Sequence, residues 1–414
     1  MERVFWLAVC SVSVYGCYCV CKATMEAFQQ RSVSFVPETT YLGWNTGFPA
    51  VTVCEKYNRH KIWELAERTY PNADTSTLSN LAMYLGDMIY YKGKCNNCNK
   101  HCSGSTKCPG DILQLAKKVF TNCSSLLGNC YWNSVQFDCC ENFYPELTPY
   151  GICYTINSLQ TTKKNVAYHK TVDLISNKLT GPGRLEFNTF EDSELHVHSP
   201  EDAFHFGHQV EPDLESKDRG NSYTIYFRIM EIANDVSLAG LGVSQRGCLL
   251  PFENPLTTYK FYSSSACITE CQAMAQLKLC GCVHQYTQVK GPGRTCDLEG
   301  ILCIHRYSEA LYEITATGLP ELNVTCNCIT PSCSEPEYTF ITTVPVELNN
   351  NAWSHYTLQM LSLPSVRYRR NVVRSKLDLV VSIGGAVGLF LGASLISAVE
   401  LIMYLCVRRT PRNA

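Results

Sequence analysis

Charge is scarce in this sequence. Charged residues make up 17% of its 414 positions, against roughly 25% in an average soluble domain, and 35 Lys and Arg are balanced by 37 Asp and Glu. A net charge of −2 lacks the electropositive field of a nucleic-acid-binding protein, so we expect no nucleic-acid partner. Three motifs of phosphate binding or catalysis are also missing: a Gly-rich phosphate loop, HExxH and GxSxG. We therefore expect no enzyme and no cofactor.

Cysteine, in contrast, is abundant. Five of the 25 cysteines lie near the chain ends, which leaves 20 in two sets of ten, from Cys54 to Cys153 and from Cys248 to Cys333. An even number at this density is typical of disulfides formed in an oxidising compartment. The sequons at Asn122 and Asn323 add two candidate glycosylation sites. The middle of the chain is therefore expected to be extracellular or lumenal.

Two apolar segments bracket this middle region. Residues 379–407 contain only Glu400 and Cys406 as ionisable groups and exceed the roughly 20 residues that cross a bilayer core. The shorter run from Val4 to Cys21 predicts a retained membrane helix, with a cleaved signal peptide as the alternative. We thus expect a short cytoplasmic start with a first span (1–21), an extracellular domain (22–378), a second span (379–407) and a cytoplasmic tail (408–414).

The distribution of basic residues disagrees with this orientation. More of them precede the second span than follow it, so the positive-inside rule would reverse the topology. We give the disulfides and sequons precedence, because both require translocation, and expect both termini to be cytoplasmic. The external basic cluster would be a solvated collar or would face an acidic surface of lipid or of another subunit: Arg367, Arg369, Arg370, Arg374 and Lys376.

The second span carries the chemistry. Gly384, Gly388 and Gly392 recur every four residues and leave one helical face without side chains. On an unbroken helix Glu400 would lie roughly 80° around from Gly392, and a carboxylate at that depth must face protein or water. A packing seam in a single-span receptor would explain the glycines. A cation pore built from several copies of this helix explains the glycines, the Gly392-Ala393-Ser394 step and Glu400 together.

Five ordered motifs carry a resemblance to a known family. They are FPAVTVC (48–54), GICYTIN (151–157), QRGC (245–248), a cysteine-rich block (266–282) continuing to Cys333, and GLFLGAS (388–394) with Glu400. On these motifs the sequence resembles the degenerin/epithelial sodium channel family, and in particular its insect pickpocket-type subunits.

The resemblance implies an α+β membrane protein, with two transmembrane helices flanking a disulfide-rich extracellular palm, finger, thumb and β-ball like those of acid-sensing channels. It also implies disulfide pairs that spacing alone does not assign. Five would form a ladder that staples a thumb helix to the returning chain. The implied pairs are Cys54 with Cys153, Cys248 with Cys333, Cys267 with Cys328, Cys271 with Cys326, Cys280 with Cys303, and Cys282 with Cys296. The resemblance leaves the eight cysteines from Cys95 to Cys140 unpaired.

By resemblance the protein is a subunit of a trimeric, amiloride-sensitive sodium channel of the plasma membrane, homomeric or mixed with related subunits and gated by an extracellular ligand or by force. Sodium would be the permeant ion. Gly392, Ala393 and Ser394 would form the selectivity filter, Gly384, Gly388 and Glu400 would line the pore, and amiloride would bind near Gly388. Val381 and Ser382 would occupy the gating position.

The family's cytoplasmic His-Gly segment before the first span is missing from the sequence. Either the sequence is truncated, or the chain is a subunit that does not gate or conduct alone. A single-span, cysteine-rich receptor is the remaining alternative, since cleavage of the first apolar segment would leave one span.

Two other clusters have competing interpretations. Cys95, Cys98, Cys102 and Cys108 with His101 could bind zinc, although disulfides are favoured in an oxidising compartment. His196, His198, His205 and His208 could bind a metal or sense protons, but we favour a solvated strand face. Along the chain we expect a link (22–58), a helical finger (61–127), strands within 185–228 and a thumb (245–333).

Overall fold

The computed structural model describes residues 2–30, 32–39, 43–93, 95, 111–160, 172–204, 214–215, 220–289, 294–334, 336–348 and 352–407. The chain forms two compact units. Unit 1 comprises residues 1–37, 233–248 and 368–414, and unit 2 comprises residues 38–232 and 249–367. Each unit is described separately.

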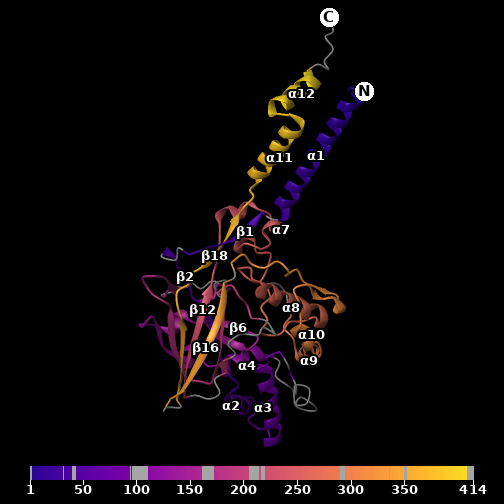
Figure 1. Cartoon of the computed structure of the whole chain (residues 1–414). Helices are drawn as coiled ribbons and strands as arrows, with labels where there is room; N and C mark the ends of the chain where they lie inside the picture. The colour runs from indigo at the N-terminus through magenta and orange to yellow at the C-terminus, as the bar shows by residue number, and fades with distance from the viewer. Residues whose placement is uncertain are drawn as a thin grey trace. The chain divides into compact units, whose positions relative to one another are not determined.

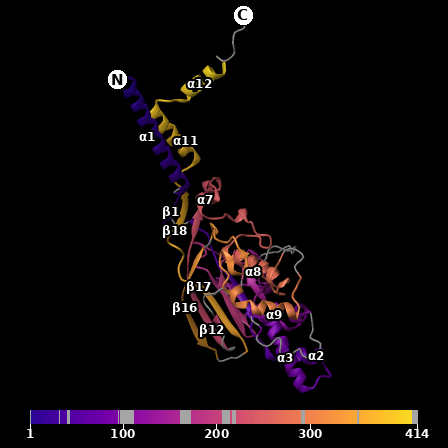
Figure 2. The same cartoon turned by 90° about the vertical axis from the view of Figure 1, so that its right-hand side faces the viewer.

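Unit 1 combines long apolar helices with a small sheet. Helices α1 and α11 run side by side in both views (Figures 1 and 2). The three strands of the sheet have the order β1-β18-β13. Its elements are α1 (Glu2–Gln30), β1 (Val33–Glu38), β13 (Ile232–Asn234), η3 (Val236–Gly240), α7 (Val243–Arg246), β18 (Arg367–Val372), α11 (Lys376–Leu391) and α12 (Leu395–Val407).

Helix α1 is longer than the sequence analysis predicted. It continues from the apolar run through residues 22–30, which were expected to form a link. This stretch is rich in Ala, Met, Glu and Gln, which favour helix, and contains no proline or glycine. Lys22 and Glu26 form an i,i+4 ion pair of 3.9 Å on its surface. The predicted boundary at residue 21 is therefore wrong as a helix end.

Two sheets form the body of unit 2. The larger has the order β16-β12-β17-β9-β4-β5, with β12 and β17 parallel, and the smaller has the order β11-β10-β3-β7-β6. Phe48, Phe187, Phe227, Tyr356 and Leu358 are fully buried in their common core. The strands are β3 (Ala50–Glu55), β4 (Leu127–Trp132), β5 (Val135–Phe137), β6 (Tyr144–Thr148), β7 (Gly151–Ile156), β9 (Arg184–Thr189), β10 (Ser193–His198), β11 (Leu214–Glu215), β12 (Asn221–Met230), β16 (Glu337–Glu347) and β17 (Ser354–Met360).

Helices form the rest of unit 2 (Figure 1). The finger helices begin at side-chain caps from Asn58, Asp74 and Asp111, whose oxygens accept backbone N–H groups of the first turn. The helices are α2 (Arg59–Thr69), α3 (Thr75–Ile89), α4 (Ile112–Val119), α5 (Cys123–Leu126), α6 (Cys139–Asn142), α8 (Ser264–Cys280), α9 (Leu298–Arg306) and α10 (Ser308–Tyr312). Short elements complete the unit: β2 (Thr46–Gly47), β8 (Ile175–Ser176), η4 (Pro251–Glu253), β14 (Gly318–Leu319), η5 (Pro320–Leu322) and β15 (Val324–Thr325).

The finger and the thumb segment, residues 249–333, share one core. The last carbonyls of a helix lack intrahelical donors. At the end of α3, Gln285 Nε2 donates to the Met88 carbonyl at 2.9 Å and the Tyr286 hydroxyl donates to the Ile89 carbonyl at 2.7 Å. The buried ring of His284 stacks on Tyr91 at 4.2 Å. Thumb side chains thus cap the finger helix.

Candidate functional site

The predicted filter residues interrupt the second apolar segment. Helix α11 ends at Gly392, whose φ of 63° is left-handed and whose N–H donates to the Gly388 carbonyl at 3.0 Å. Ser394 then starts α12: its hydroxyl accepts from the Ser397 N–H at 3.2 Å, and the two hydroxyl oxygens lie 3.1 Å apart. Glycine and serine therefore encode a non-helical step at 392–394, and Figure 2 shows α12 turning away from the line of α11.

This break corrects two sequence-based expectations. Residues 379–407 are not one helix but α11 and α12, of 16 and 13 residues. Glu400 therefore lies on a different helix from Gly388, and the angle predicted for an unbroken helix does not apply. Within the described residues, α1 is the one helix both long and apolar enough to cross a membrane.

Helix α11 has two different faces. Ala386 is buried, and the ring of Phe390 contacts α1 at Gly16. Gly384 and Gly388 lie about 160° around the helix from Ala386. A Cβ added at Gly384 would meet nothing within 4 Å, and one at Gly388 would only touch the Ala393 carbonyl at 3.7 Å. We call the open side, with Gly384 and Gly388, the glycine face.

The two residues predicted at the gating position fall on different sides of α11. Val381 is 65% exposed and lies about 140° from Ala386, next to the glycine face. Ser382 lies one turn before Ala386 and is exposed as well. Of the two, Val381 is the residue nearer to the glycine face.

The basic cluster before α11 has acidic partners within the chain. In unit 2, Arg367 pairs with Glu38 at 2.9 Å and stacks over Trp44 at 4.3 Å. In unit 1, Arg369 lies 3.5 Å from Asp235. Hydrogen bonds from Ser237 lower the pKa of Asp235, which keeps this carboxylate ionised. These two arginines are therefore not a freely solvated collar.

The third arginine of the cluster belongs to a tightly bonded part of unit 1. Arg370 is 7% exposed, its guanidinium lies over Phe35 at 4.9 Å, and it donates to Cys248 Sγ. Nearby Arg246, of the QRGC motif, is 5% exposed and donates to the carbonyls of Cys248, Leu238 and Leu241 at 2.9, 3.2 and 3.2 Å. The QRGC motif alone does not indicate this role for Arg246.

The structure contains five of the implied disulfides. They are Cys54 with Cys153, Cys267 with Cys328, Cys271 with Cys326, Cys280 with Cys303, and Cys282 with Cys296. Cys248 and Cys333 are both disulfide-bonded, as their implied pairing requires, and that pairing stays a prediction. The four thumb bridges are nested in sequence, so each closes a loop inside the previous one.

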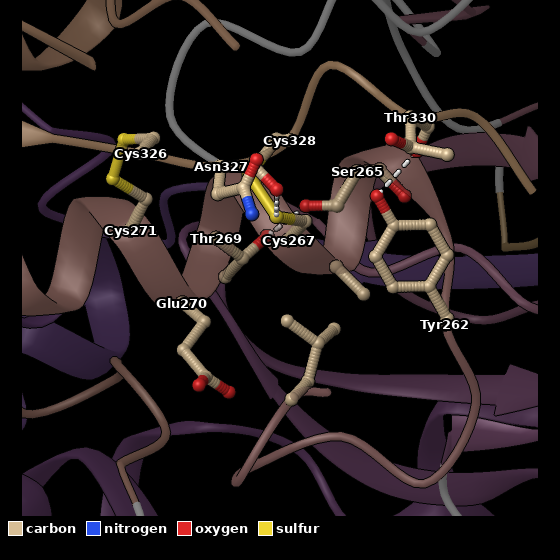
Figure 3. Close-up of a disulfide and its surroundings, with 12 residues drawn as sticks. Tyr262, Ser265, Cys267, Thr269, Glu270, Cys271, Cys326, Asn327, Cys328 and Thr330 are labelled. Atoms are coloured by element: carbon tan, nitrogen blue, oxygen red, sulfur yellow. Dashed lines mark hydrogen bonds between the residues drawn. A yellow bond between two sulfur atoms is a disulfide. The ribbon is translucent and has the colours of Figure 1, made fainter. Parts of the chain in front are cut away.

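Figure 3 shows how the two outer bridges of this nest hold α8. Cys267 and Cys271 lie one turn apart on the helix and bond to Cys328 and Cys326 of the returning chain, just after β15. Beside them the Tyr262 hydroxyl donates to the Thr330 carbonyl at 2.5 Å. Glu270 holds the preceding loop by accepting the N–H groups of Thr257 and Thr258.

Two further bridges pair cysteines that the resemblance left open. Cys123 bonds to Cys140, and Cys130 bonds to Cys139 across the β4–β5 hairpin and the start of α6. Cys95 is disulfide-bonded as well, which favours the disulfide interpretation over zinc at this position. Cys98, His101, Cys102 and Cys108 lie outside the described residues.

The histidine expectation is wrong for the described residues. His196 and His198 are 4% and 6% exposed, because both faces of β10 are covered. His205 and His208 lie outside the described residues. The predicted glycosylation residues Asn122 and Asn323 are exposed, so each is accessible to a glycan.

Comparison with known proteins settles the family. A family model described as "Amiloride-sensitive sodium channel" matches residues 1–404. The chain belongs to this family. Members are membrane ion channels and not enzymes, so the family confirms the expectation of a non-enzymatic, disulfide-rich transport protein.

Relatives within the family share limited identity with this chain. "Pickpocket protein 11" of Drosophila melanogaster is 28% identical over 42% of this chain and 35% of its own length. "Sodium channel protein Nach" of the same fly is 24% identical over 72% of this chain and 60% of its own length. The human "Bile acid-sensitive ion channel" is 30% identical over 36% of this chain and 32% of its own length. These alignments span less than two thirds of each relative.

Proposed function

We propose that the protein is a subunit of a trimeric sodium channel of the plasma membrane, with α1 and the α11–α12 segment crossing the bilayer and both termini in the cytoplasm. The glycine face of α11 is the observation that carries this proposal. It remains open after α1 has covered the opposite side. Three such faces meeting around an axis would bring bare backbone to a narrow, water-filled path.

In this arrangement the filter is the non-helical step. At residues 392–394 the backbone leaves the helix, and such backbone is tolerated at membrane depth where it lines a cavity. Carbonyl groups of this step and the Ser394 hydroxyl would replace part of the hydration shell of sodium. Glu400, exposed on α12, would attract cations at the inner end of the path. An amiloride-type cation would block at Gly388, one turn outside the break.

The extracellular unit would supply the gate's lever. Nested disulfides make α8 a stiff element, and the segment bonded to it continues through β16 and β17 to β18, which directly precedes α11. A ligand or a force acting on the finger and thumb would move this connection. Expressing the chain alone or together with related subunits, and recording current in each case, distinguishes homomeric from mixed trimers.

Voltage-clamp recording with sodium replacement tests the proposal. We expect an inward sodium current that amiloride blocks, that Ser394→Lys abolishes and that Glu400→Ala reduces. Leu389→Ala, which is 81% exposed on α11 and lies about 100° or more around the helix from both Gly384 and Gly388, is the matched control and should retain the current. Current unaffected by both pore variants would refute the pore assignment. Surface trimers without current, alone or with related subunits, would favour a modulatory subunit, and mature protein lacking residues 1–21 would favour a single-span receptor.

A further inference from the structure

Four buried polar side chains form a row across the smaller sheet of unit 2. Glu146 on β6, Thr155 on β7, Thr52 on β3 and His198 on β10 come from four adjacent strands. Their exposed fractions are 9%, 0%, 0% and 6%. A polar row this deep in a sheet is costly unless every member is hydrogen-bonded.

The row is continuous. The Thr52 hydroxyl oxygen lies 2.8 Å from that of Thr155 and 3.0 Å from His198 Nε2, and Thr155 is also hydrogen-bonded to the Glu146 carboxyl group. At the far end His198 Nδ1 lies 2.9 Å from the Ser199 carbonyl oxygen. Because a carbonyl only accepts, Nδ1 carries a proton in either charge state of the ring.

The number of protons that the row needs limits the protonation states of Glu146 and His198. Three hydrogen bonds link Glu146 to His198, and each needs one proton. The hydroxyls of Thr155 and Thr52 supply two. The third must come from a protonated Glu146 carboxyl or from a proton on His198 Nε2. If neither end carried it, one link would bring two lone pairs together.

Both ends of the row meet the thumb. Beyond His198, Asp202 accepts a hydrogen bond from the Ser265 hydroxyl at 2.7 Å. Beyond Glu146, Tyr259 is hydrogen-bonded to Thr269. Ser265 and Thr269 are one turn apart on α8, on either side of Cys267 in sequence (Figure 3). The row therefore spans the sheet between two contacts with the same helix.

We propose that the row from Glu146 to His198 is a binding site for one shared proton, whose presence determines how firmly the sheet holds the N-terminal turns of α8. The proposal depends on unit 2 and not on the pore assignment. With the proton on Glu146, the hydroxyls point toward a neutral His198. With the proton on Nε2, the same hydroxyls point toward a carboxylate. The loss of that proton breaks one link and leaves a carboxylate buried.

Burial favours the first arrangement, because it raises the pKa of Glu146 to about 7 and lowers the pKa of His198. The charge of Asp202 opposes this at the other end of the row by raising the pKa of His198, but burial is the larger effect there. Burial also raises the pKa of Tyr259, which Glu270 faces, and of Tyr338, which Glu201 and Asp202 face, so both phenols are neutral. A proton therefore resides on Glu146 up to neutral pH and leaves as the pH rises through about 7.

Infrared difference spectroscopy on the purified full-length protein in detergent tests the site. Between pH 6 and pH 8 the wild type should lose the carbonyl stretch of one protonated carboxyl group, with a midpoint near pH 7. Glu146→Gln should remove this signal, since its amide donates to Thr155 permanently. Thr155→Val should shift the midpoint upward by roughly one pH unit, while Thr155→Ser should keep the wild-type midpoint.

Hydrogen exchange of α8 tests the coupling in the same samples. In the wild type, the backbone amides of residues 264–270 should lose protection from exchange between pH 6 and pH 8. Glu146→Gln should stay protected and serves as the reference at each pH. A carboxyl signal that persists in Glu146→Gln, or equal midpoints for Thr155→Val and Thr155→Ser, would overturn the shared proton. If Glu146→Gln does not fold, the comparison of Thr155→Val with Thr155→Ser still tests the shared proton. Both readouts are independent of ion current, so they fail separately from the pore proposal.

Discussion

Gly16 of α1 and Phe390 of α11 meet so closely that a Cβ at Gly16 would lie 2.8 Å from Cε1 of the ring. Any other residue at this crossing would therefore force the ring of Phe390 to shift. The contact decides which side of α11 faces α1, and so leaves the glycine face open. Two residues separated by most of the chain thus orient the helix that we propose to line the pore.

Replacing Gly16 should separate the two helices. We expect Gly16→Leu to cost about 1–3 kcal/mol of packing and to reduce the amount of protein at the cell surface. Gly384→Ala, whose added methyl group meets open space, should leave surface protein unchanged and alter sodium current instead. Surface biotinylation with current recording measures both, and equal surface loss for the two variants would contradict the face assignment.

The nested thumb disulfides should contribute unequally when removed in turn. Replacing Cys267 and Cys328 by serine frees only four residues on one side and two on the other, because Cys271–Cys326 still closes the loop. We expect a loss of about 2 kcal/mol for this first pair and a total of more than twice that when both pairs are removed. Thermal unfolding of unit 2 in the full-length protein measures this, and strictly additive losses would argue against a nest.

Substitution of Arg246 by lysine should destabilise unit 1. One guanidinium donates to three carbonyls, whereas an ammonium group on a lysine stem does not reach all of them. We expect Arg246→Lys to destabilise unit 1 by about 2–4 kcal/mol and to lower surface expression, and Ser244→Ala, at an exposed neighbouring position, to have no effect. Normal expression of the lysine variant would show that the carbonyls need no such donor.

His284 should make the joint of finger and thumb sensitive to acid. Burial lowers its pKa to about 3 from an ordinary value of 6.5. The native state therefore binds fewer protons than the unfolded state between these values, so stability is complete above pH 6.5 and falls as the pH drops toward 3. We expect a loss of about 2 kcal/mol by pH 5, absent in His284→Gln. Unfolding midpoints from pH 7 to pH 4 measure the difference, and identical slopes would refute it.

Local patterns of the sequence predicted the helical finger and the strands within 185–228. The pairs of the thumb ladder were implied by the family resemblance, because cysteine spacing alone does not assign them. The glycines and Ser394 also indicated an unusual step at 392–394. Its effect on the helix was missed, since a left-handed Gly392 and the reciprocal Ser394–Ser397 cap are geometric and leave hydropathy unchanged.

Long-range burial was not predictable in the same way. The alternating LHVH of β10 is typical of a strand with one wet face, yet its histidines are buried because segments distant in sequence cover both sides. Likewise the partner of Arg367 is Glu38, 329 residues away. The end of α1 was placed too early because residues 22–30 are polar but strongly helix-forming.

Cysteine accessibility in α11 tests the central claim most directly. Gly388→Cys on the glycine face and Ala386→Cys on the side toward α1 differ by two residues and about 160° around the helix. Applied to the conducting channel from outside, a charged thiol reagent should block the sodium current of Gly388→Cys and leave Ala386→Cys and the wild type unaffected. Block of Ala386→Cys with Gly388→Cys spared would contradict the account.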